Sequence, residues 1–323
     1  MNVRRLIPST AAAGAVALGL MAVSACSSSA ADGRSGDGKL KVVASFYPMQ
    51  YLAEQIGGDH VSVSALTPPG IEPHDFELKP RQTAELNEAG YILYLKGIQP
   101  AVDKAIAQSE AKNKLDAATL TKLEHHGTAG GHSHEGEDAG HDEHDHEGEA
   151  GADPHIWLDP VKYAEVAKGV GTSLEKADPD HAADYKKNTA ALVTKLNGLH
   201  TEFQSGLKNT ATKTFITTHS AFGYLAERYG LDQEGIAGID PESEPSPARI
   251  KELQAVAAKD KVSTVFFETL ASDKTAKTLA EDAGLKTDVL DPLEGITGKS
   301  KGRDYIEVME SNLAALQKAL GAK

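Results

Sequence analysis

Residues 178–207 read DPDHAADYKKNTAALVTKLNGLHTEFQSGL, and this stretch decides the fold. Gly198 is the only glycine or proline between Pro179 and Gly206. The opening Asp178-Pro179 suits the cap and first turn of a helix, and apolar residues follow at helical spacing at Ala182, Tyr185, Ala190, Val193, Leu196, Leu199 and Phe203. The pattern predicts one helix of about thirty residues, about 40 Å long. Such a helix is long for a small domain, so we interpret it as a rigid strut that joins two lobes.

Strands and helices alternate on both sides of this stretch. Before it, the sequence predicts strands at 41–46, 61–66 and 91–95 and helices at 49–56, 80–89 and 160–175. After it, strands are expected at 214–218, 235–239, 264–267 and 287–290 and helices at 221–229, 247–258, 273–283 and 303–320. Strands that alternate with helices form parallel sheets with both faces covered. The expected fold class is therefore α/β, with two parallel-sheet lobes, 39–177 and 208–323, joined by a single long helix at 178–207.

The N-terminus has the features of an export signal. Arg4 and Arg5 precede an uncharged apolar run that ends near Cys26, so residues 1–25 are expected to form a signal peptide. Cys26 is the only cysteine in the chain and can form no internal disulfide. Its setting after Val-Ser-Ala resembles the bacterial lipobox, which implies lipidation at Cys26 and attachment to the membrane through that lipid. The polar, glycine-rich residues 26–38 are expected to form a flexible tether.

Charge is concentrated in one segment, residues 124–153. The whole chain has a formal net charge of -14, which argues against nucleic acid as a partner. Ten of the acidic residues lie in this segment, which has no lysine or arginine and contains His125, His126, His132, His134, His141, His144 and His146. It has almost no apolar side chains to offset the loss of chain entropy on folding, so we expect it to be a disordered loop.

Four short segments carry histidines or carboxylates where strands are expected to end. They are Gly-Ile-Glu-Pro-His-Asp-Phe at 70–76, Asp-Pro-His-Ile-Trp-Leu-Asp-Pro at 153–160, Thr-Thr-His-Ser-Ala-Phe-Gly-Tyr at 217–224, and Leu-Asp-Pro-Leu-Glu-Gly-Ile at 290–296. Ligands of open α/β sheets bind outside the carboxyl ends of the strands, so these loops can converge on one site. The imidazoles of His74, His155 and His219 would then meet a carboxylate. That donor set suits tetrahedral Zn²⁺.

These segments, in this order and with a long helix between the second and third, resemble the solute-binding proteins of zinc and manganese ABC transporters. This metal-binding cluster of periplasmic-type binding proteins includes zinc-uptake and streptococcal adhesin lipoproteins. The resemblance covers about residues 40–320, and the Glu-Pro-Ser-Pro segment at 244–247 belongs to it. It implies that His74, His155 and His219 are metal ligands, that the metal lies between two lobes bridged by one long helix, and that the partner is the membrane permease of an ABC transporter. We expect a monomer.

The fourth ligand has three candidates. Asp291 lies where manganese-binding relatives place an aspartate, whereas zinc-binding relatives with a Pro-Leu-Glu segment point to Glu294. Glu72 is the third candidate, although Pro73 separates it from His74, and in some relatives a glutamate directly precedes this histidine. The sequence leaves the choice open.

His219 favours zinc over manganese as the metal. Manganese-type relatives tend to have a glutamate at this position, and manganese prefers oxygen donors. The predicted function is therefore a high-affinity extracytoplasmic zinc-binding protein, with Zn²⁺ as the transported ligand, and the alternative is manganese binding. The His-rich segment 124–153 is interpreted as a mobile, low-affinity zinc collector, or else as a solvated acidic linker.

Two further classes of protein compete with a carrier. Three histidines and a carboxylate can hold a catalytic zinc, as in a hydrolase. The chain has no His-Glu-x-x-His segment, no serine nucleophile elbow and no phosphate loop, so we do not expect an enzyme. A purely adhesive surface lipoprotein would leave the histidines of the four segments without a role.

Overall fold

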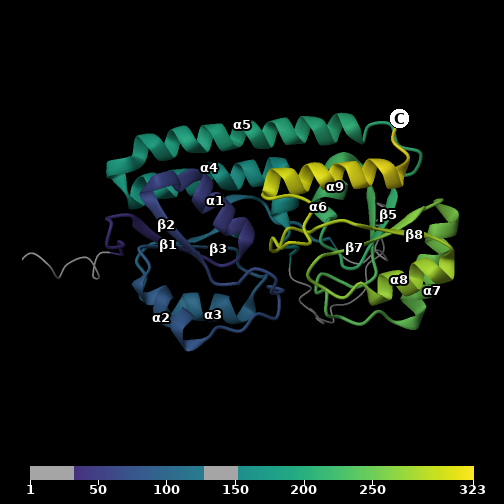
Figure 1. Cartoon of the computed structure of the whole chain (residues 1–323), viewed down its shortest axis with the longest axis horizontal. Coiled ribbons are helices and arrows are strands. Elements are labelled where there is room, and N and C mark those ends of the chain that lie inside the picture. The colour runs from purple at the N-terminus through teal and green to yellow at the C-terminus, as the bar shows by residue number, and fades with distance from the viewer. Residues whose placement is uncertain (1–32, 127–151) are drawn as a thin grey trace, which may run out of the picture.

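The computed structural model describes residues 33–126 and 152–323. The signal peptide, Cys26 and residues 127–151 of the His-rich segment lie outside the described residues. Two four-stranded sheets lie side by side (Figure 1). Among the described residues, every pair of neighbouring strands in these sheets is parallel. The predicted fold class, two parallel-sheet lobes joined by a long helix, is confirmed.

The first lobe contains the sheet β2-β1-β3-β4. Its strands are β1 Leu40–Ala44, β2 Val61–Ala65, β3 Tyr91–Tyr94 and β4 Lys114–Asp116. Helix α1 (Tyr47–Gly57) covers one face, and α2 (Pro80–Glu88) and α3 (Pro100–Gln108) cover the other (Figure 1). Neither α3 nor β4 was predicted from the sequence. β4 is a short edge strand of sequence Lys-Leu-Asp, which carries almost no periodic apolar signal.

The second lobe repeats this order as β6-β5-β7-β8. Its strands are β5 Thr214–Thr217, β6 Asp232–Gly235, β7 Thr264–Phe267 and β8 Lys286–Val289, and its helices are α6 Gly223–Tyr229, α7 Pro247–Lys259, α8 Lys274–Ala283 and α9 Tyr305–Leu320. β6 begins earlier than the predicted 235–239. Gly230 ends α6 in the left-handed conformation, so the chain enters the sheet directly afterwards through the polar edge residues of β6.

The strut is a helical hairpin rather than an isolated helix. α4 (Pro160–Ala177) leads into a 3₁₀ turn at Pro179–His181, and α5 (Ala182–Gly206) returns along α4 (Figure 1). α5 has 25 residues and is about 37 Å long. It begins later than predicted because the carboxylate of Asp178 accepts hydrogen bonds from the hydroxyl of Tyr185 at 2.6 Å and from His181 at 2.7 Å instead of capping the helix.

One apolar core passes through both lobes. It includes Val42 and Leu93 from the first sheet, Phe215 from the second, and Leu196 of α5. α5 packs on α1 and α4 along the first lobe and on α9 along the second. The indole of Trp157 also donates a hydrogen bond to the carbonyl of Pro292 at 2.7 Å. The two lobes are therefore fused by packing as well as by the chain.

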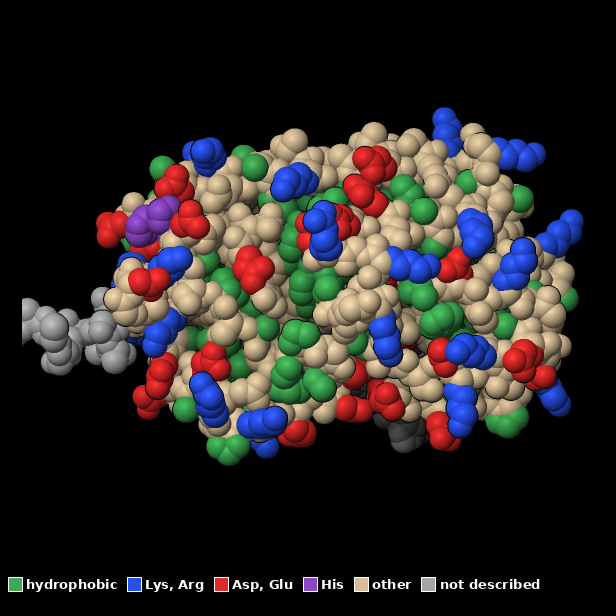
Figure 2. All heavy atoms as spheres, viewed as in Figure 1, with side chains coloured by type: hydrophobic (Ala, Val, Ile, Leu, Met, Phe, Trp, Pro, Cys, Tyr) green, Lys and Arg blue, Asp and Glu red, His purple; other side chains and the backbone are tan. Residues whose placement is uncertain are grey.

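The ordered chain begins before Leu40. Arg34 forms an ion pair with Asp178 at 2.7 Å, and the amide of Lys41 donates to the carbonyl of Gly33 at 2.9 Å. The expectation of a flexible tether over 26–38 is therefore wrong for residues 33–38. Acidic and basic side chains are interspersed over the face drawn in Figure 2. Among the described residues, no helix combines the length and apolar character needed to cross a bilayer.

Candidate metal centre

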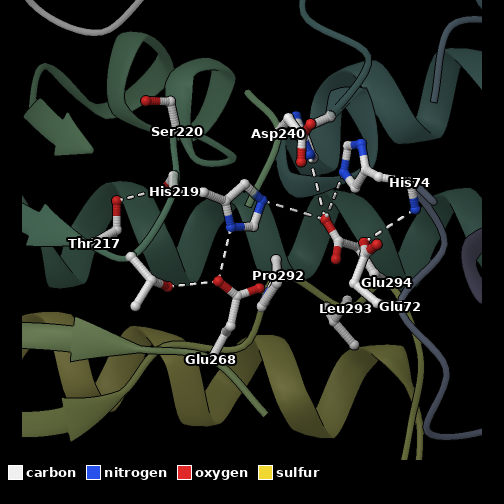
Figure 3. A network of polar contacts seen from close by, with 12 residues as sticks. Glu72, His74, Thr217, His219, Ser220, Asp240, Glu268, Pro292, Leu293 and Glu294 are labelled. Atoms are coloured by element: carbon white, nitrogen blue, oxygen red, sulfur yellow. Dashed lines mark hydrogen bonds and ion pairs between the residues drawn. The ribbon is translucent and has the colours of Figure 1, made fainter. Parts of the chain in front are cut away.

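Four side chains, those of His74, His155, His219 and Glu294, converge between the lobes. The Nε2 atoms of the three histidines lie 3.3, 3.4 and 3.3 Å, respectively, from Oε1 of Glu294, and Figure 3 shows the contacts of His74 and His219. Zinc sits about 2.0–2.2 Å from nitrogen and oxygen ligands, so two ligands on a tetrahedron are about 3.3–3.5 Å apart. The three nitrogen–oxygen distances therefore fit a tetrahedral metal site.

Strand ends bring most of these residues together. His74 lies in the loop that follows β2, His219 comes two residues after β5, and Glu294 lies in the loop that follows β8. His155 is different, because it directly precedes the 3₁₀ turn Ile156–Leu158 that leads into α4. The prediction that every one of the four segments follows a strand is therefore wrong for His155.

The cluster is almost completely closed to solvent. The side chain of His74 is 9% exposed, and the other three are at most 1% exposed. Within the described part of the chain, Nε2 of His155, Nε2 of His219 and Oε2 of Glu294 are buried without a hydrogen-bond partner. Buried polar atoms are normally satisfied because leaving them unpaired is costly. A bound cation would satisfy both nitrogens.

Two further carboxylates orient the imidazoles from behind. Nδ1 of His155 donates to Oδ1 of Asp153 at 2.7 Å, and Nδ1 of His219 donates to Oε1 of Glu268 at 2.8 Å. A carboxylate can only accept, so each contact places the proton on Nδ1 and leaves Nε2 free to bind a metal. Glu268 was not predicted from the sequence, where its only signal is its position directly after β7. Asp153 ends the acidic segment 124–153 and begins the Asp-Pro-His segment; it is fully buried, so the expected lack of packing is wrong for this residue.

The charges of the cluster stabilise one another. Burial alone would raise the pKa of the Glu294 carboxyl, but the nearby imidazoles of His155, His219 and His74 hold that pKa well below its usual range. Burial alone would lower the pKa of His219, but Glu268 and Glu294 raise that pKa well above its usual value. The pKa of His155 is also raised, because Asp153 and Glu294 outweigh its burial. Without metal, protons on these imidazoles therefore balance the buried carboxylates.

Asp291 and Glu72 do not enter the cluster. Oδ1 of Asp291 accepts a hydrogen bond from the amide of Leu293 at 2.9 Å. Leu293 has a φ of +59°, which is uncommon for a branched residue and needs such support. Asp291 thus holds the turn that presents Glu294. Glu72 accepts from the amide of His74 at 3.0 Å, so it fixes the loop that carries this histidine (Figure 3).

The arrangement defines a class of protein. The four side chains could fill all four positions of a tetrahedral metal site, whereas a catalytic zinc site keeps one position open for water or substrate. A closed His₃Glu cluster between two parallel-sheet lobes, with one long helix along both, belongs to a two-lobed metal-binding protein of the solute-binding kind.

The family follows from comparison with known proteins. The family model described as "Zinc-uptake complex component A periplasmic" matches residues 42–319, so the chain belongs to that family, as the resemblance predicted. It is a family of transport components rather than of enzymes.

Two relatives illustrate the match. The chain is 38% identical over 289 residues to the zinc-binding lipoprotein AdcA of Streptococcus pneumoniae serotype 4, which covers 88% of this chain and 56% of that protein. It is 37% identical over 317 residues to the high-affinity zinc uptake system protein ZnuA of Bacillus subtilis, which covers 95% and 97% of the two chains. The chain thus spans little more than half the length of AdcA.

Solved structures agree with the fold. The Zn(II)-bound ZnuA-like domain of Streptococcus pneumoniae AdcA matches with a TM-score of 0.70 and 34% identity over 88% of this chain and 99% of that one. The laminin-binding protein Lmb of Streptococcus agalactiae, described as a bifunctional protein with adhesin and metal-transporting activity, matches with a TM-score of 0.75 and 31% identity over 87% and 99%.

Proposed function

We propose that this protein captures Zn²⁺ outside the cytoplasm and delivers it to the membrane permease of an ABC transporter. The observation that carries the proposal is the set of three Nε2 atoms, of His74, His155 and His219, at 3.3–3.4 Å from one oxygen of Glu294. These four residues are the proposed ligands. The names of AdcA and ZnuA, which refer to zinc binding and zinc uptake, support the same function.

The donor set favours zinc over manganese. Three imidazole nitrogens and one carboxylate oxygen suit a borderline ion in tetrahedral geometry, whereas manganese prefers more oxygen donors and higher coordination. The carboxylates of Asp153 and Glu268 behind His155 and His219 make these imidazoles stronger ligands for zinc. Burial of the cluster supports a carrier rather than a hydrolase, because a hydrolytic zinc needs room for water and substrate.

The N-terminal part of the proposal concerns export and anchoring. Residues 1–25 would direct export, and Cys26 would carry the lipid that holds the mature monomer at the membrane surface. The name of the AdcA relative, a zinc-binding lipoprotein, supports this localisation. Residues 127–151, with histidines interleaved with acids, would collect zinc weakly beside the closed centre. The lobes 39–177 and 208–323 and the linking helix are retained as the proposed domains.

The proposal is tested by metal titration of the mature chain in competition with a chelator. Each chain should retain one Zn²⁺ in competition with the chelator. Mn²⁺ at equal concentration should not displace this Zn²⁺. In cells that lack the native copy, this protein should restore zinc accumulation in zinc-depleted medium. Tight binding of Mn²⁺ in preference to Zn²⁺, or zinc accumulation that does not depend on the protein, would refute it. A Cys26→Ser chain should bind zinc normally but be released from the membrane.

A further inference from the structure

The two ends of the His-rich segment are tied together on the second lobe. The amide of Asp153 donates to the carbonyl of Glu124 at 2.8 Å. The hydroxyl of Tyr224 in α6 accepts from the amide of Glu124 at 2.8 Å and donates to the carbonyl of Asp153 at 2.8 Å. Glu124, His126 and Asp153 therefore make ordered contacts, and the expectation of a disordered loop over 124–153 is wrong for these three residues.

The imidazole ring of His126 is held by close contacts on several sides. The imidazole packs edge-on against Tyr224, with ring centroids 4.4 Å apart and an interplanar angle of 81°. It also lies directly over Gly223, where a Cβ atom would come within 2.4 Å of the ring, so only glycine fits. Nδ1 of His126 donates to Oδ2 of Asp153 at 2.8 Å. These contacts fix the ring and direct Nε2 away from the buried aspartate.

One carboxylate contacts this nitrogen, and a second lies nearby. Nε2 of His126 lies 3.1 Å from Oε2 of Glu227 in α6, and one donor atom each of Glu124, His126 and Glu227 lie within 4.8 Å of one another. We call these three residues the outer cluster. An imidazole nitrogen with its other nitrogen bound to a carboxylate, together with two further carboxylates, is a donor set for a zinc-like divalent cation.

We propose that the outer cluster is a second divalent-cation site, distinct from the closed centre. Glu227 is 60% exposed and His126 18% exposed, so solvent ions reach it directly. The ammonium of Lys162 lies 3.3 Å from Glu124 and already offsets part of its charge. A cation here binds more weakly than in the centre and exchanges faster, because it has fewer protein donors and more water.

Asp153 joins the two sites. Its Oδ1 orients His155 of the centre, and its Oδ2 orients His126 of the outer cluster. One buried carboxylate therefore supports one imidazole in each site. A cation that holds His126 in place also holds the Asp153 carboxylate on which the orientation of His155 depends. The outer cluster is therefore coupled to the centre and serves as a waiting position, that is, a site that binds zinc transiently before it enters the centre. The waiting role rests on the proposed zinc-capture function, whereas the cation site itself does not.

The test uses the mature full chain with zinc as the probe. Crystals grown with excess Zn²⁺ should show an anomalous peak at the zinc absorption edge between His126, Glu124 and Glu227, in addition to the peak at the centre. The His126→Ala and Glu227→Gln chains should lose this peak and one weakly bound zinc equivalent by calorimetry, with the tight equivalent retained. The matched control is His125→Ala, which removes the exposed neighbouring histidine and should keep the outer peak.

A zinc peak at the centre alone would overturn the outer site while leaving the proposed function intact. Loss of the weak equivalent in His125→Ala as well would also overturn it, because the weak binding would then not belong to this geometry. Absence of the central peak would instead count against the proposed function, so the two failures are distinguishable.

Discussion

Nδ1 of His155 donates a hydrogen bond of 2.7 Å to the carboxylate of Asp153, and both residues are fully buried. Asp153 is not among the four converging donors, yet it sets the tautomer and orientation of one of them. Such outer partners typically contribute about 10–100-fold to metal affinity.

We therefore expect Asp153→Ala to weaken zinc binding about 10–100-fold, because His155 loses the group that fixes its ring. Asp153→Asn should have a smaller effect, since the amide oxygen can still accept from Nδ1. Chelator competition at neutral pH measures both. Asp180→Ala, at an exposed position, is the control. Equal, negligible losses in both Asp153 variants, with the fold intact by circular dichroism, would contradict this role.

Replacing Glu294 and Asp291 one at a time distinguishes the proposed metal ligand from the residue that holds its loop. Glu294→Gln should lower zinc affinity by orders of magnitude, as should His74→Ala, His155→Ala or His219→Ala, because a chelate site loses both a bond and its geometry. Asp291→Asn should change affinity mildly but lower the melting temperature, since the left-handed turn at Leu293 loses its charged acceptor. A severe affinity loss in Asp291→Asn with none in Glu294→Gln would reverse the assignment.

Two deletions that differ by a few residues should behave differently. Removing 127–151 and joining the ends with a short glycine linker should abolish the weak zinc binding of that segment, but leave the outer cluster and the tight site intact. Removing 124–153 should also weaken the tight site, because Asp153 is lost with it. Calorimetry distinguishes tight from weak equivalents. If the longer deletion bound zinc as tightly as the shorter one, the role of Asp153 would be refuted.

The features that could be predicted from the sequence are those that depend on local residue patterns. The long helix, the alternation of strands and helices, and the three histidines could be identified from periodicity, strand ends and the resemblance of four short segments. The start of α5 was predicted too early. The carboxylate of Asp178 contacts the hydroxyl of Tyr185 instead of capping the helix, and periodicity does not reveal this contact.

The rest of the site depends on tertiary contacts. Glu268 could not be identified because only the pairing of β5 with β7 brings it to His219. The position of Glu294 rather than Asp291 in the cluster goes with the left-handed backbone of Leu293, which propensity does not predict. Asp153 was misassigned because composition describes the acidic segment as a whole, whereas burial is decided residue by residue.

The stability of the metal-free protein and the stabilising effect of zinc should change with pH in opposite directions. The pKa values of His155 and His219 are raised in the metal-free fold despite burial, because Asp153, Glu268 and Glu294 favour their protonated forms. A raised folded-state pKa gives stability that is fully present below about pH 6.5 and is lost as pH rises through the folded value. The pKa of Glu294 is lowered in the folded state. Its carboxyl is ionised in both the folded and the unfolded state from about pH 6 to 8, so it does not make the free energy of unfolding depend on pH in this range.

The metal-free protein should therefore melt at a higher temperature at about pH 6 than at about pH 8. Zinc competes with these protons, so its stabilising effect should be larger at the higher pH. Melting curves with a chelator and with excess zinc measure both trends. The His219→Ala chain, which lacks one of the protonated groups, should show a flatter metal-free trend. A zinc-induced shift that is larger at the lower pH would contradict the proton competition.

The long helix limits how the protein can respond to zinc. α5 is a continuous helix of 25 residues that packs on both lobes, and one apolar core joins them. The hydrogen bond from Trp157 to the carbonyl of Pro292 adds a link close to the metal centre. Wide hinge closure would break this packing, so release should require only a small tilt and local loop movement.

The proposed ligands nevertheless cross-link the lobes, since His74 and His155 precede the helix and His219 and Glu294 follow it. Zinc binds a site that does not exist in the unfolded chain, so it should raise the melting temperature by several degrees or more. Small-angle scattering should show an almost unchanged radius of gyration. Measuring the chain that lacks 127–151 removes any contribution of the His-rich segment. If that chain compacted substantially on zinc addition, the helix would not be acting as a rigid strut.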